Sequence, residues 1–342
     1  MKRMVFFFAL GLIGLVSLAY FFSFKLTADE KFLSPLASRQ TEEKKGPLTK
    51  YEFETLADRQ SRGSQIELEK IISEEEDYTA YLFSFRTEGK KVTGQANIPK
   101  KEGKKPVIVM LRGYADDNIY FTGLGTRKAA GVFAENGFIT LAPDFLGFGG
   151  SDSASNDILE ARFEKPVTVL DLLASIKTLP EADPEKIALW GHSNGGQIAL
   201  SILEITKKKI PTTLWAPVSK GFPQSILFYM SDEPPAEEEE QKNYFKVKET
   251  VENFSKEYEP KKFSIDSYFA DIVAPLQIHQ GTADQLVPIS WSDTLAKELA
   301  DLGKEVSYWT YNADDHNLAK NWDLVVQRDL TFFRKKLDLS DN

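Results

Sequence analysis

Short apolar runs alternate with longer amphipathic stretches from residue 105 onward. The first run, 107–111, is apolar throughout, as is typical of a strand buried on both faces of a parallel sheet. Similar runs follow at 138–142, 187–190, 213–215, 276–278 and 306–309. Helical patterns lie between or after them, over 127–135, 159–178, 197–206, 291–302 and 318–337. Strands that alternate with helices predict βαβ units, and therefore an α/β fold with a mostly parallel, doubly wound sheet.

Two segments depart from this alternation. Residues 66–99 alternate apolar and polar positions, which predicts antiparallel strands ahead of the parallel sheet. Residues 218–270 separate two predicted strands and contain a run of four glutamates at 237–240 and an amphipathic stretch at 244–258. A connection of this length inside a compact domain is usually functional, so we expect a helical lid insertion over the site. A solvated surface insertion with no role is the alternative.

The N-terminal residues 4–24 are almost entirely apolar and follow the basic pair Lys2 and Arg3. At about 1.5 Å per residue, a helix of this length spans a hydrocarbon core of about 30 Å. We therefore predict a signal anchor within 1–25, an N-terminal transmembrane helix that holds the protein in the membrane. The basic pair would stay inside, leaving the catalytic domain extracytoplasmic. Signal peptide cleavage, giving a secreted protein, is the alternative, because 17–19 includes small residues that suit signal peptidase.

Polar residues of mixed charge fill 26–65 and predict a stalk or N-terminal extension, with some helix over 50–59. Nothing in this stretch suggests catalytic chemistry. The main domain is then expected to cover 66–337, with the insertion at 218–270 inside it.

Charge and composition exclude several classes of function. The 342 residues carry 51 acidic and 42 basic side chains, a formal net charge of −9, which would repel nucleic acid. There is no cysteine, so disulfides, thiolate metal sites, lipid attachment through cysteine and a cysteine nucleophile are excluded. The three histidines show no metal-ligand spacing, so we expect neither a metal nor a cofactor.

The run 191–195, Gly-His-Ser-Asn-Gly, places Ser193 between a predicted strand and a predicted helix. This is the context of a nucleophile elbow, in which a strained turn exposes the serine and its neighbours must be small to avoid the strand and the helix. The sequence therefore indicates Ser193 as a catalytic nucleophile.

A serine hydroxyl needs a general base, and the chain offers His192, His279 and His316. His192 is expected to point away from the elbow, and His279 lies within an apolar strand, where a structural histidine is the better interpretation. His316 follows the last predicted strand on a loop before the final helix. We therefore predict His316 as the base.

The orienting acid is predicted to be Asp284, in the segment 281–288 that follows a buried strand. Serine, acid and histidine then occur in the chain order of an elbow-type triad. Asp314 and Asp315 compete for the role, although a side chain so close to His316 in sequence rarely reaches its Nδ1 atom in a useful geometry.

An oxyanion hole requires two backbone N–H groups directed at the oxygen of the tetrahedral intermediate. One is expected at Asn194, immediately after the nucleophile. The second is expected in the loop after the strand 107–111, at Tyr114.

These features together resemble the α/β-hydrolase superfamily, and within it the prolyl-oligopeptidase-like (S9) catalytic domain and related esterases. The resemblance covers about 92–337 and implies the α/β-hydrolase fold. It is carried by 105–109, 143–151, 191–196, 281–288 and His316. Where the family pattern has His-Gly, this chain has Arg112-Gly113.

The function expected is that of a serine hydrolase cleaving carboxylic esters through an acyl-enzyme on Ser193. The main alternative is an S9-like serine peptidase acting on short peptides. Peptidase relatives usually carry a large β-propeller before the hydrolase domain, and the stretch ahead of the first core strand is too short to hold one. An amidase, an acyltransferase and a non-catalytic binding module are the remaining alternatives. The expected partner is a small-molecule ester or a short peptide.

Overall fold

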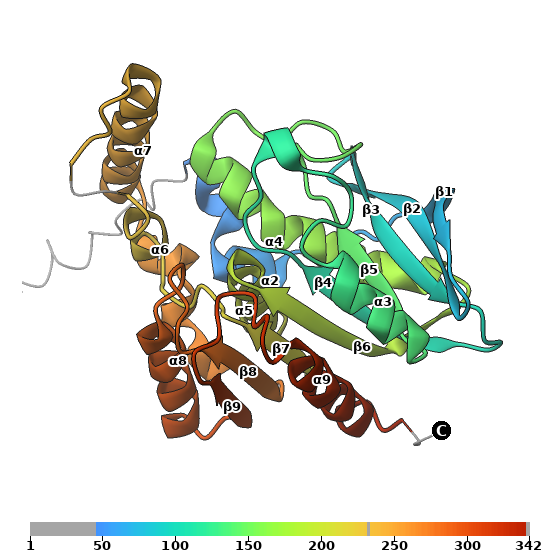
Figure 1. The fold of residues 1–342 in the computed structure, drawn as a ribbon. Helices are drawn as coiled ribbons and strands as arrows, with labels where there is room; N and C mark the ends of the chain where they lie inside the picture. The colour runs from blue at the N-terminus through green and yellow to red at the C-terminus, as the bar shows by residue number, and fades with distance from the viewer. Residues whose placement is uncertain (1–45, 231–232, 340–342) are drawn as a thin grey trace, which may run out of the picture. The chain divides into compact units, whose positions relative to one another are not determined.

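The computed structural model describes residues 46–230 and 233–339, and Pro47 begins a compact unit that continues to the C-terminus (Figure 1). In the described part of the chain, nine strands form one sheet in the order β1-β2-β3-β5-β4-β6-β7-β8-β9. The strands are β1 (Glu67–Glu74), β2 (Tyr78–Thr87), β3 (Lys90–Pro99), β4 (Lys105–Leu111), β5 (Ile139–Pro143), β6 (Ala182–His192), β7 (Thr212–Trp215), β8 (Leu276–Gly281) and β9 (Val306–Tyr311). The pairs β1–β2, β2–β3 and β3–β5 are antiparallel, and the strands from β5 to β9 in this order run parallel. The predicted antiparallel strands and mostly parallel sheet are both confirmed.

Helices cover both faces of the twisted sheet (Figure 1). They are α2 (Phe53–Asp58), α3 (Arg127–Glu135), α4 (Ile158–Ser175), α5 (Asn194–Thr206), α6 (Gln224–Leu227), α7 (Glu238–Glu257), α8 (Ile289–Asp301) and α9 (Trp322–Lys336). Short 3-10 turns are η1 (Pro47–Tyr51), η2 (Asp117–Ile119), η3 (Ile176–Thr178), η4 (Pro260–Phe263), η5 (Ile265–Ser267) and η6 (Phe269–Asp271).

Strand β4 shows why its sequence is apolar throughout. Val107, Val109 and Leu111 belong to the core cluster formed with α2, α4, α5 and α8. Ile108 and Met110 belong to the second cluster, formed with α3 and α9. Successive side chains of a strand point to opposite faces, so a strand with helices on both sides needs apolar residues at every position. Strand β9 lies at the edge of the sheet and is correspondingly half exposed.

The N-terminal extension does not remain separate from the domain up to residue 65. Leu48, Tyr51, Phe53 and Leu56, on η1 and α2, are buried in the main core cluster. The packed unit therefore begins at Pro47, because these apolar side chains cover one side of α4 and α5. The helix expected over 50–59 is present as α2.

Within residues 46–230 and 233–339, no helix combines the length and the apolar character needed to cross a membrane. The predicted anchor at 1–25 lies outside the described residues, as does the extension up to 45.

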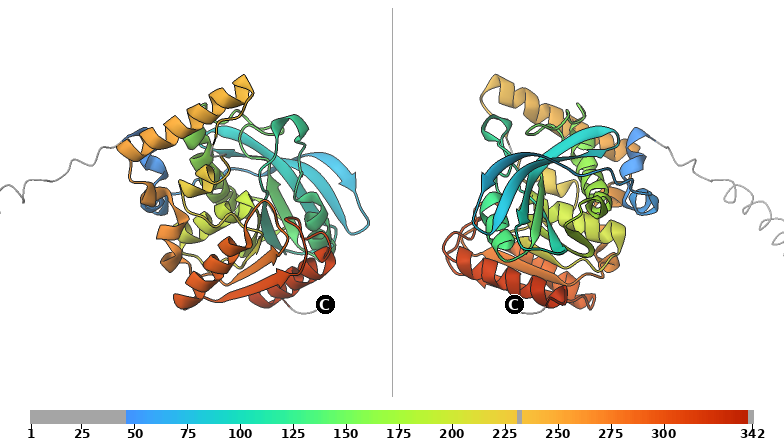
Figure 2. Two further views of the ribbon diagram at one scale, coloured as in Figure 1. Left: turned by 60° about the vertical axis from the view of Figure 1, so that its left-hand side comes forward. Right: turned by 90° about the vertical axis from the view of Figure 1, so that its right-hand side faces the viewer.

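The insertion at 218–270 contains α6, α7 and three 3-10 turns. Helix α7 packs through Val251 and Phe254, and the Phe254 ring lies 5.8 Å from that of Phe163 on α4. Its N-terminal half carries no buried residue, and Phe245 is exposed. Figure 2 shows this helix projecting from one end of the unit, away from the sheet. The segment is helical as predicted, and its action as a lid remains a prediction.

Candidate active site

Ser193 occupies the sharp turn between β6 and α5. Its backbone angles are φ 53° and ψ −120°, a strained conformation for a residue with a side chain. The turn is held by hydrogen bonds on both sides of the serine: its N–H donates to the Trp215 carbonyl at 2.9 Å, and its own carbonyl accepts from Gly196 and Val218 N–H. This is the backbone geometry expected of a nucleophile elbow.

Two glycines allow the backbone to approach this turn closely. A Cβ atom at Gly195 would lie 1.8 Å from the Leu111 carbonyl oxygen, so α5 can begin this close to the end of β4 only with glycine there. A Cβ atom at Gly113 would lie 3.0 Å from the Ser193 Cβ and 3.5 Å from its Oγ. The loop that begins after β4 therefore lies against the serine hydroxyl. Tyr114 is the next residue of this loop, and its side chain is exposed.

Asn194 is the first residue of α5. The first N–H groups of a helix have no partner within the helix and carry its partial positive charge. The predicted donors at Asn194 and Tyr114 thus lie on the two segments that flank Ser193.

His316 and Asp284 meet on the loops that follow the adjacent parallel strands β9 and β8. The His316 Nδ1 lies 2.8 Å from Asp284 Oδ2, and the Asp284 side chain is fully buried. The other carboxylate oxygen, Oδ1, accepts from Leu286 N–H at 2.8 Å and Val287 N–H at 2.9 Å. Burial raises the pKa of Asp284, but the hydrogen bonds from His316 and Val287 outweigh it, so its pKa lies below the ordinary value. The carboxylate is therefore ionised at neutral pH.

The two competing acids have other partners. Asp314 is buried and accepts backbone N–H groups from Asp315, Lys320 and Asn321, each at 3.0 Å. Asp315 is exposed and accepts from the backbone of the residues that follow His316. Both carboxylates shape the loop that carries His316, and this loop delays the start of α9 from the expected residue 318 to Trp322.

The family model described as "Prolyl oligopeptidase family" matches residues 125–340, which is more than half of the chain. The chain belongs to the prolyl oligopeptidase family. It is therefore a serine hydrolase with the α/β-hydrolase fold, as the sequence predicted.

Relatives of both peptidase and esterase type share this fold. The chain is 24% identical over 274 residues to a Bacillus subtilis protein described as "Uncharacterized peptidase YtmA", covering 79% of this chain and 98% of that one. An acetyl xylan esterase from Paenibacillus sp. R4 superposes with a TM-score of 0.62 at 18% identity, over 83% of this chain and 94% of the esterase. The acylaminoacyl peptidase of Pyrococcus horikoshii superposes with a TM-score of 0.58 at 20% identity, over 78% of this chain. The match spans only 43% of that peptidase's length.

Arg112, at the position where the family pattern has histidine, supports the loop beside the nucleophile. Its guanidinium donates to the Gly113 carbonyl at 2.9 Å and to the Asp144 carbonyl at 3.1 Å. It also lies over the rings of Tyr120 and Phe148, at 4.5 and 4.2 Å from the ring centroids. Stacking and hydrogen bonding together fix a planar guanidinium better than either does alone. The residue that departs from the family pattern is thus part of the scaffold of this family member's site.

Sequence reasoning did not find this role of Arg112. The segment 143–151 was recognised as a family feature, but its link to residue 112 depends on the contact between two loops. A buried arginine beside a glycine is a weak signal without the aromatic rings that cover it.

His192 lies beside the proposed base. Its Nε2 is 3.1 Å from the His316 carbonyl oxygen, and the two imidazole rings are 4.7 Å apart. Burial, and then the neighbouring His316, lower the pKa of His192 to about 4. His192 is therefore neutral at pH 7, and it holds the backbone of His316 without placing a second charge next to it.

His279 is part of a buried network that joins the sheet to α9. Its Nε2 lies 3.0 Å from Asp329 Oδ1, and its Nδ1 lies 2.7 Å from the Tyr311 hydroxyl. Trp215 donates to the second Asp329 oxygen at 2.8 Å, and Arg328 donates to the Tyr311 hydroxyl at 2.8 Å. Every polar atom of the ring has a partner within the fold, which agrees with the structural role predicted for this histidine.

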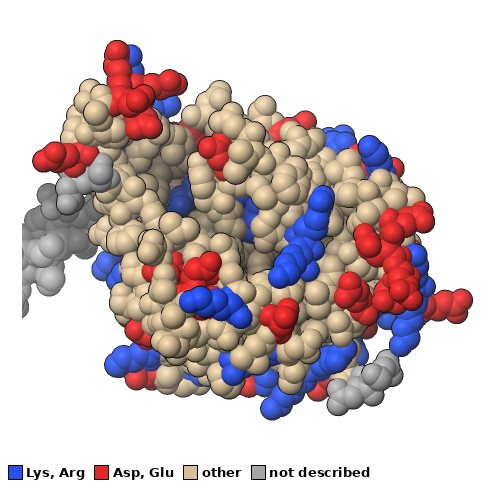
Figure 3. All heavy atoms as spheres, in the orientation of Figure 1, with Lys and Arg blue, Asp and Glu red and all other residues tan. Residues whose placement is uncertain are grey.

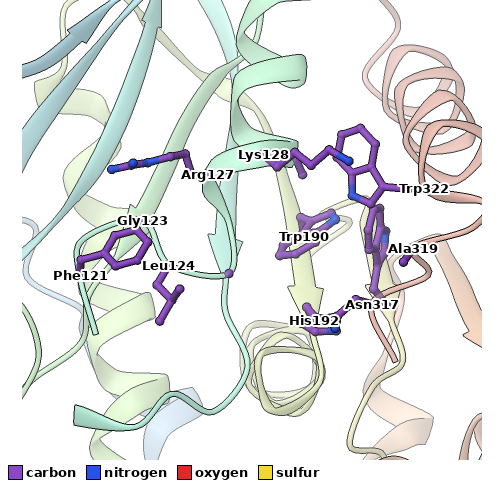
Figure 4. Close-up of a pocket in the computed structure, with 13 residues that line it drawn as sticks. Phe121, Gly123, Leu124, Arg127, Lys128, Trp190, His192, Asn317, Ala319 and Trp322 are labelled. Atoms are coloured by element: carbon purple, nitrogen blue, oxygen red, sulfur yellow. The ribbon is translucent and has the colours of Figure 1, made fainter. Parts of the chain in front are cut away.

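A cavity of about 530 Å³ adjoins the site on the side of the sheet covered by α3 and α9 (Figure 4). Trp190, His192, Asn317 and Trp322 line it, and the Lys128 ammonium lies 3.5 Å from the Trp322 ring centroid. His192 and Asn317 are sequence neighbours of the predicted serine and histidine, but neither Ser193 nor His316 lines the cavity. It is therefore a neighbouring space and not the position of the reacting bond.

In residues 46–230 and 233–339, no three acidic or histidine side chains gather closely enough to bind a metal ion.

Proposed function

We propose that this family member hydrolyses carboxylic esters through an acyl-enzyme on Ser193. The observation that carries the proposal is the 2.8 Å hydrogen bond between His316 Nδ1 and Asp284 Oδ2, together with the elbow conformation of Ser193. An ionised carboxylate only accepts hydrogen bonds, so Nδ1 carries the proton and Nε2 is the ring atom that can accept one. This is the tautomer that a general base requires.

In the proposed mechanism, Ser193 Oγ attacks the acyl carbon while its proton moves to His316 Nε2. The oxyanion accepts hydrogen bonds from Asn194 and Tyr114 N–H, each worth roughly 3 kcal/mol of the barrier. Collapse of the intermediate expels the alcohol, which takes the proton from His316. A water molecule then repeats the sequence on the acyl-enzyme and releases the acid. Asp284 keeps the imidazole oriented throughout and stabilises its protonated form.

The preference for esters draws on the extent of the structural matches. The match to the Paenibacillus acetyl xylan esterase extends over 94% of that enzyme, whereas the match to the Pyrococcus acylaminoacyl peptidase extends over 43%. An ester also has a better leaving group than an amide, so the site needs less help in expelling it.

The second candidate is hydrolysis of short peptides by the same residues. It is favoured by the family itself and by the Bacillus relative described as a peptidase, which is matched over 98% of its length.

Fluorophosphonate labelling tests the nucleophile. Wild-type protein should be labelled, Ser193→Ala should not, and the exposed-serine control Ser153→Ala should behave as wild type. Equal labelling of Ser193→Ala and wild type would refute the assignment. A panel of p-nitrophenyl acyl esters beside aminoacyl and prolyl anilides then separates the two candidates: higher kcat/KM for the anilides would make the chain a peptidase.

We further propose that residues 1–25 anchor the protein in a membrane, with the catalytic domain outside the cytoplasm. The support is the apolar run 4–24 behind Lys2 and Arg3. Carbonate extraction should leave the full-length protein in the membrane pellet. Full-length protein in the supernatant would exclude the anchor, and a shortened mature protein in the medium would indicate cleavage and secretion.

A further inference from the structure

Two basic side chains on α4 face the elements that carry the active site. Arg162 and Lys165 are three residues apart and therefore lie on the same side of the helix. The Arg162 guanidinium donates to the Gln197 side-chain oxygen and, at 2.9 Å, to Ser225 Oγ. Gln197 lies in the first turn of α5, just after Ser193, and Ser225 lies on α6. Arg162 is thus held between the nucleophile helix and the insertion.

Among the described residues, no carboxylate lies within ion-pair distance of Arg162 or Lys165, and Lys165 makes no hydrogen bond there. Burial lowers the pKa of Arg162 to about 10. Burial, and then Arg162 and Arg112, lower the pKa of Lys165 to about 8. Both side chains are only partly exposed to solvent. A charge withdrawn from water is costly unless it is paired, so two such cations without an acidic partner would stabilise an anion placed beside them.

The two cations lie within electrostatic reach of the proposed triad. Burial and then Asp284 raise the pKa of Tyr229 to about 12, and Arg162 acts on Tyr229 in the opposite direction. The Tyr229 hydroxyl therefore lies within electrostatic range of both Asp284 and Arg162. On the other side, Lys165 is near Arg112, whose neighbour Gly113 lies against the serine hydroxyl.

The surface is hollowed on the face that carries α7 and the loops of the central sheet (Figure 3). Figure 3 shows a depression between α7 and the central loops, with lysine or arginine atoms at its floor. Phe228 and Tyr229 pack against Trp291 nearby, with ring centroids 4.7 and 6.2 Å from it. The surroundings of Arg162 thus combine positive charge with an aromatic wall, as a site for an organic anion requires.

We propose that Arg162 and Lys165 form a subsite for a carboxylate carried by the substrate, beside Ser193. The proposal rests on the ester hydrolysis proposed above and narrows its substrate class to anionic esters. A guanidinium binds both oxygens of a carboxylate through its parallel N–H groups, and an ammonium adds a compact charge. The carboxylate belongs either to the acyl part or to the leaving group, and the two sources require different substrates in the test.

The experiment compares kcat/KM for matched pairs of anionic and neutral esters. Mono-p-nitrophenyl glutarate against p-nitrophenyl valerate tests a carboxylate on the acyl part, and 4-acetoxybenzoate against 4-methylphenyl acetate tests one on the leaving group. In at least one pair, the wild type should have a higher kcat/KM for the anionic ester than for the neutral one. In that pair, Lys165→Gln should reduce the ratio of the anionic to the neutral kcat/KM about 10-fold. The exposed-lysine control Lys209→Gln removes the same charge and should keep the wild-type ratio.

Lys165→Gln is the decisive variant because Lys165 makes no hydrogen bond in the described structure, so its loss should not disturb the fold. Arg162→Gln should have the same effect, with its folding checked by circular dichroism because it also removes the contacts to Gln197 and Ser225. The subsite alone would be overturned if both variants still hydrolyse esters through Ser193 and their anionic-to-neutral ratios of kcat/KM stay within about 2-fold of wild type in both substrate pairs. Absence of Ser193-dependent turnover of every ester would overturn the proposed function and the subsite with it.

Discussion

Replacing Asp284 by asparagine tests the proposed triad at the hydrogen bond between Asp284 and His316. The two carboxylate oxygens accept four hydrogen bonds, from the side chains of His316 and Gln280 and from the N–H groups of Leu286 and Val287. An amide has one accepting oxygen and one donating nitrogen. If the asparagine oxygen keeps the hydrogen bonds from the two backbone N–H groups, its NH₂ group faces the donors of His316 and Gln280.

His316 can adapt to this amide only by giving up its Nδ1 proton and carrying it on Nε2. That tautomer cannot accept the proton of Ser193, and the same change in a serine-histidine-aspartate triad costs about 10⁴-fold in kcat, or about 5.4 kcal/mol. Gln280 cannot adapt in this way, because its own side-chain oxygen already accepts from Ser292 at 2.8 Å. The Gln280 Nε2 also donates to the carbonyls of Gly281 at 3.3 Å and Val287 at 3.4 Å, so it keeps acceptors in the variant. The variant loses the hydrogen bond from Gln280 to a charged carboxylate, which is worth about 1–3 kcal/mol of stability.

The assay is kcat for a p-nitrophenyl ester together with urea unfolding. Asp284→Asn should lose about 10⁴-fold in kcat and about 1–3 kcal/mol in stability. Asp315→Asn is the matched control, because the amide oxygen can keep the two backbone hydrogen bonds that Asp315 Oδ1 accepts in the loop. The residue is exposed and next to His316 in sequence, and kcat should change by less than about 3-fold. A kcat for Asp284→Asn within about 10-fold of wild type would show that the base is oriented by something else.

Three further changes test the scaffold. His192 has a pKa of about 4 in the folded protein against 6.5 for the free group. Between these pH values only the unfolded state binds the extra proton, so the free energy of unfolding falls as the pH falls. The wild type should therefore lose more unfolding free energy between pH 7 and pH 5 than His192→Gln does. Gly195→Ala should lower Tm severely, because its Cβ would lie 1.8 Å from the Leu111 carbonyl oxygen. Arg59→Ala should cost about 3–5 kcal/mol in urea unfolding, because it leaves the buried carboxylate of Asp171 without the guanidinium that binds both its oxygens at 2.7 and 2.9 Å.

Each of these three predictions would be contradicted by a different result. An unchanged pH slope in His192→Gln would mean that the imidazole titrates normally. A Gly195→Ala protein with the Tm of the wild type would mean that the elbow relaxes freely around the added Cβ. A loss below about 1 kcal/mol in Arg59→Ala would show that η1 and α2 are not tied to the domain through this pair.

Much of the fold could be predicted because it depends on local patterns. A strand with helices on both sides must be mostly apolar, and the six runs found in the sequence are the parallel strands of the sheet, of which the edge strand β9 is half exposed. The predicted boundary of the N-terminal extension at residue 65 was wrong, because the burial of residues 47–58 depends on tertiary packing and not on a local pattern. Leu48, Tyr51, Phe53 and Leu56 are too few and too irregularly spaced to predict burial, and they are buried because α4 and α5 offer an apolar surface.

The candidate site also has a part that local sequence patterns predict and a part that depends on tertiary packing. The sequence by itself predicted Ser193 as the nucleophile, because a glycine-flanked serine between a strand and a helix is a local feature. It also predicted His316 as the base, because the chain offers only three histidines. Only the tertiary structure decided that Asp284, and not Asp314 or Asp315, meets His316, because the contact joins loops after two adjacent strands. The same holds for the unpaired cations on α4, whose position beside the nucleophile helix depends on how separate elements pack.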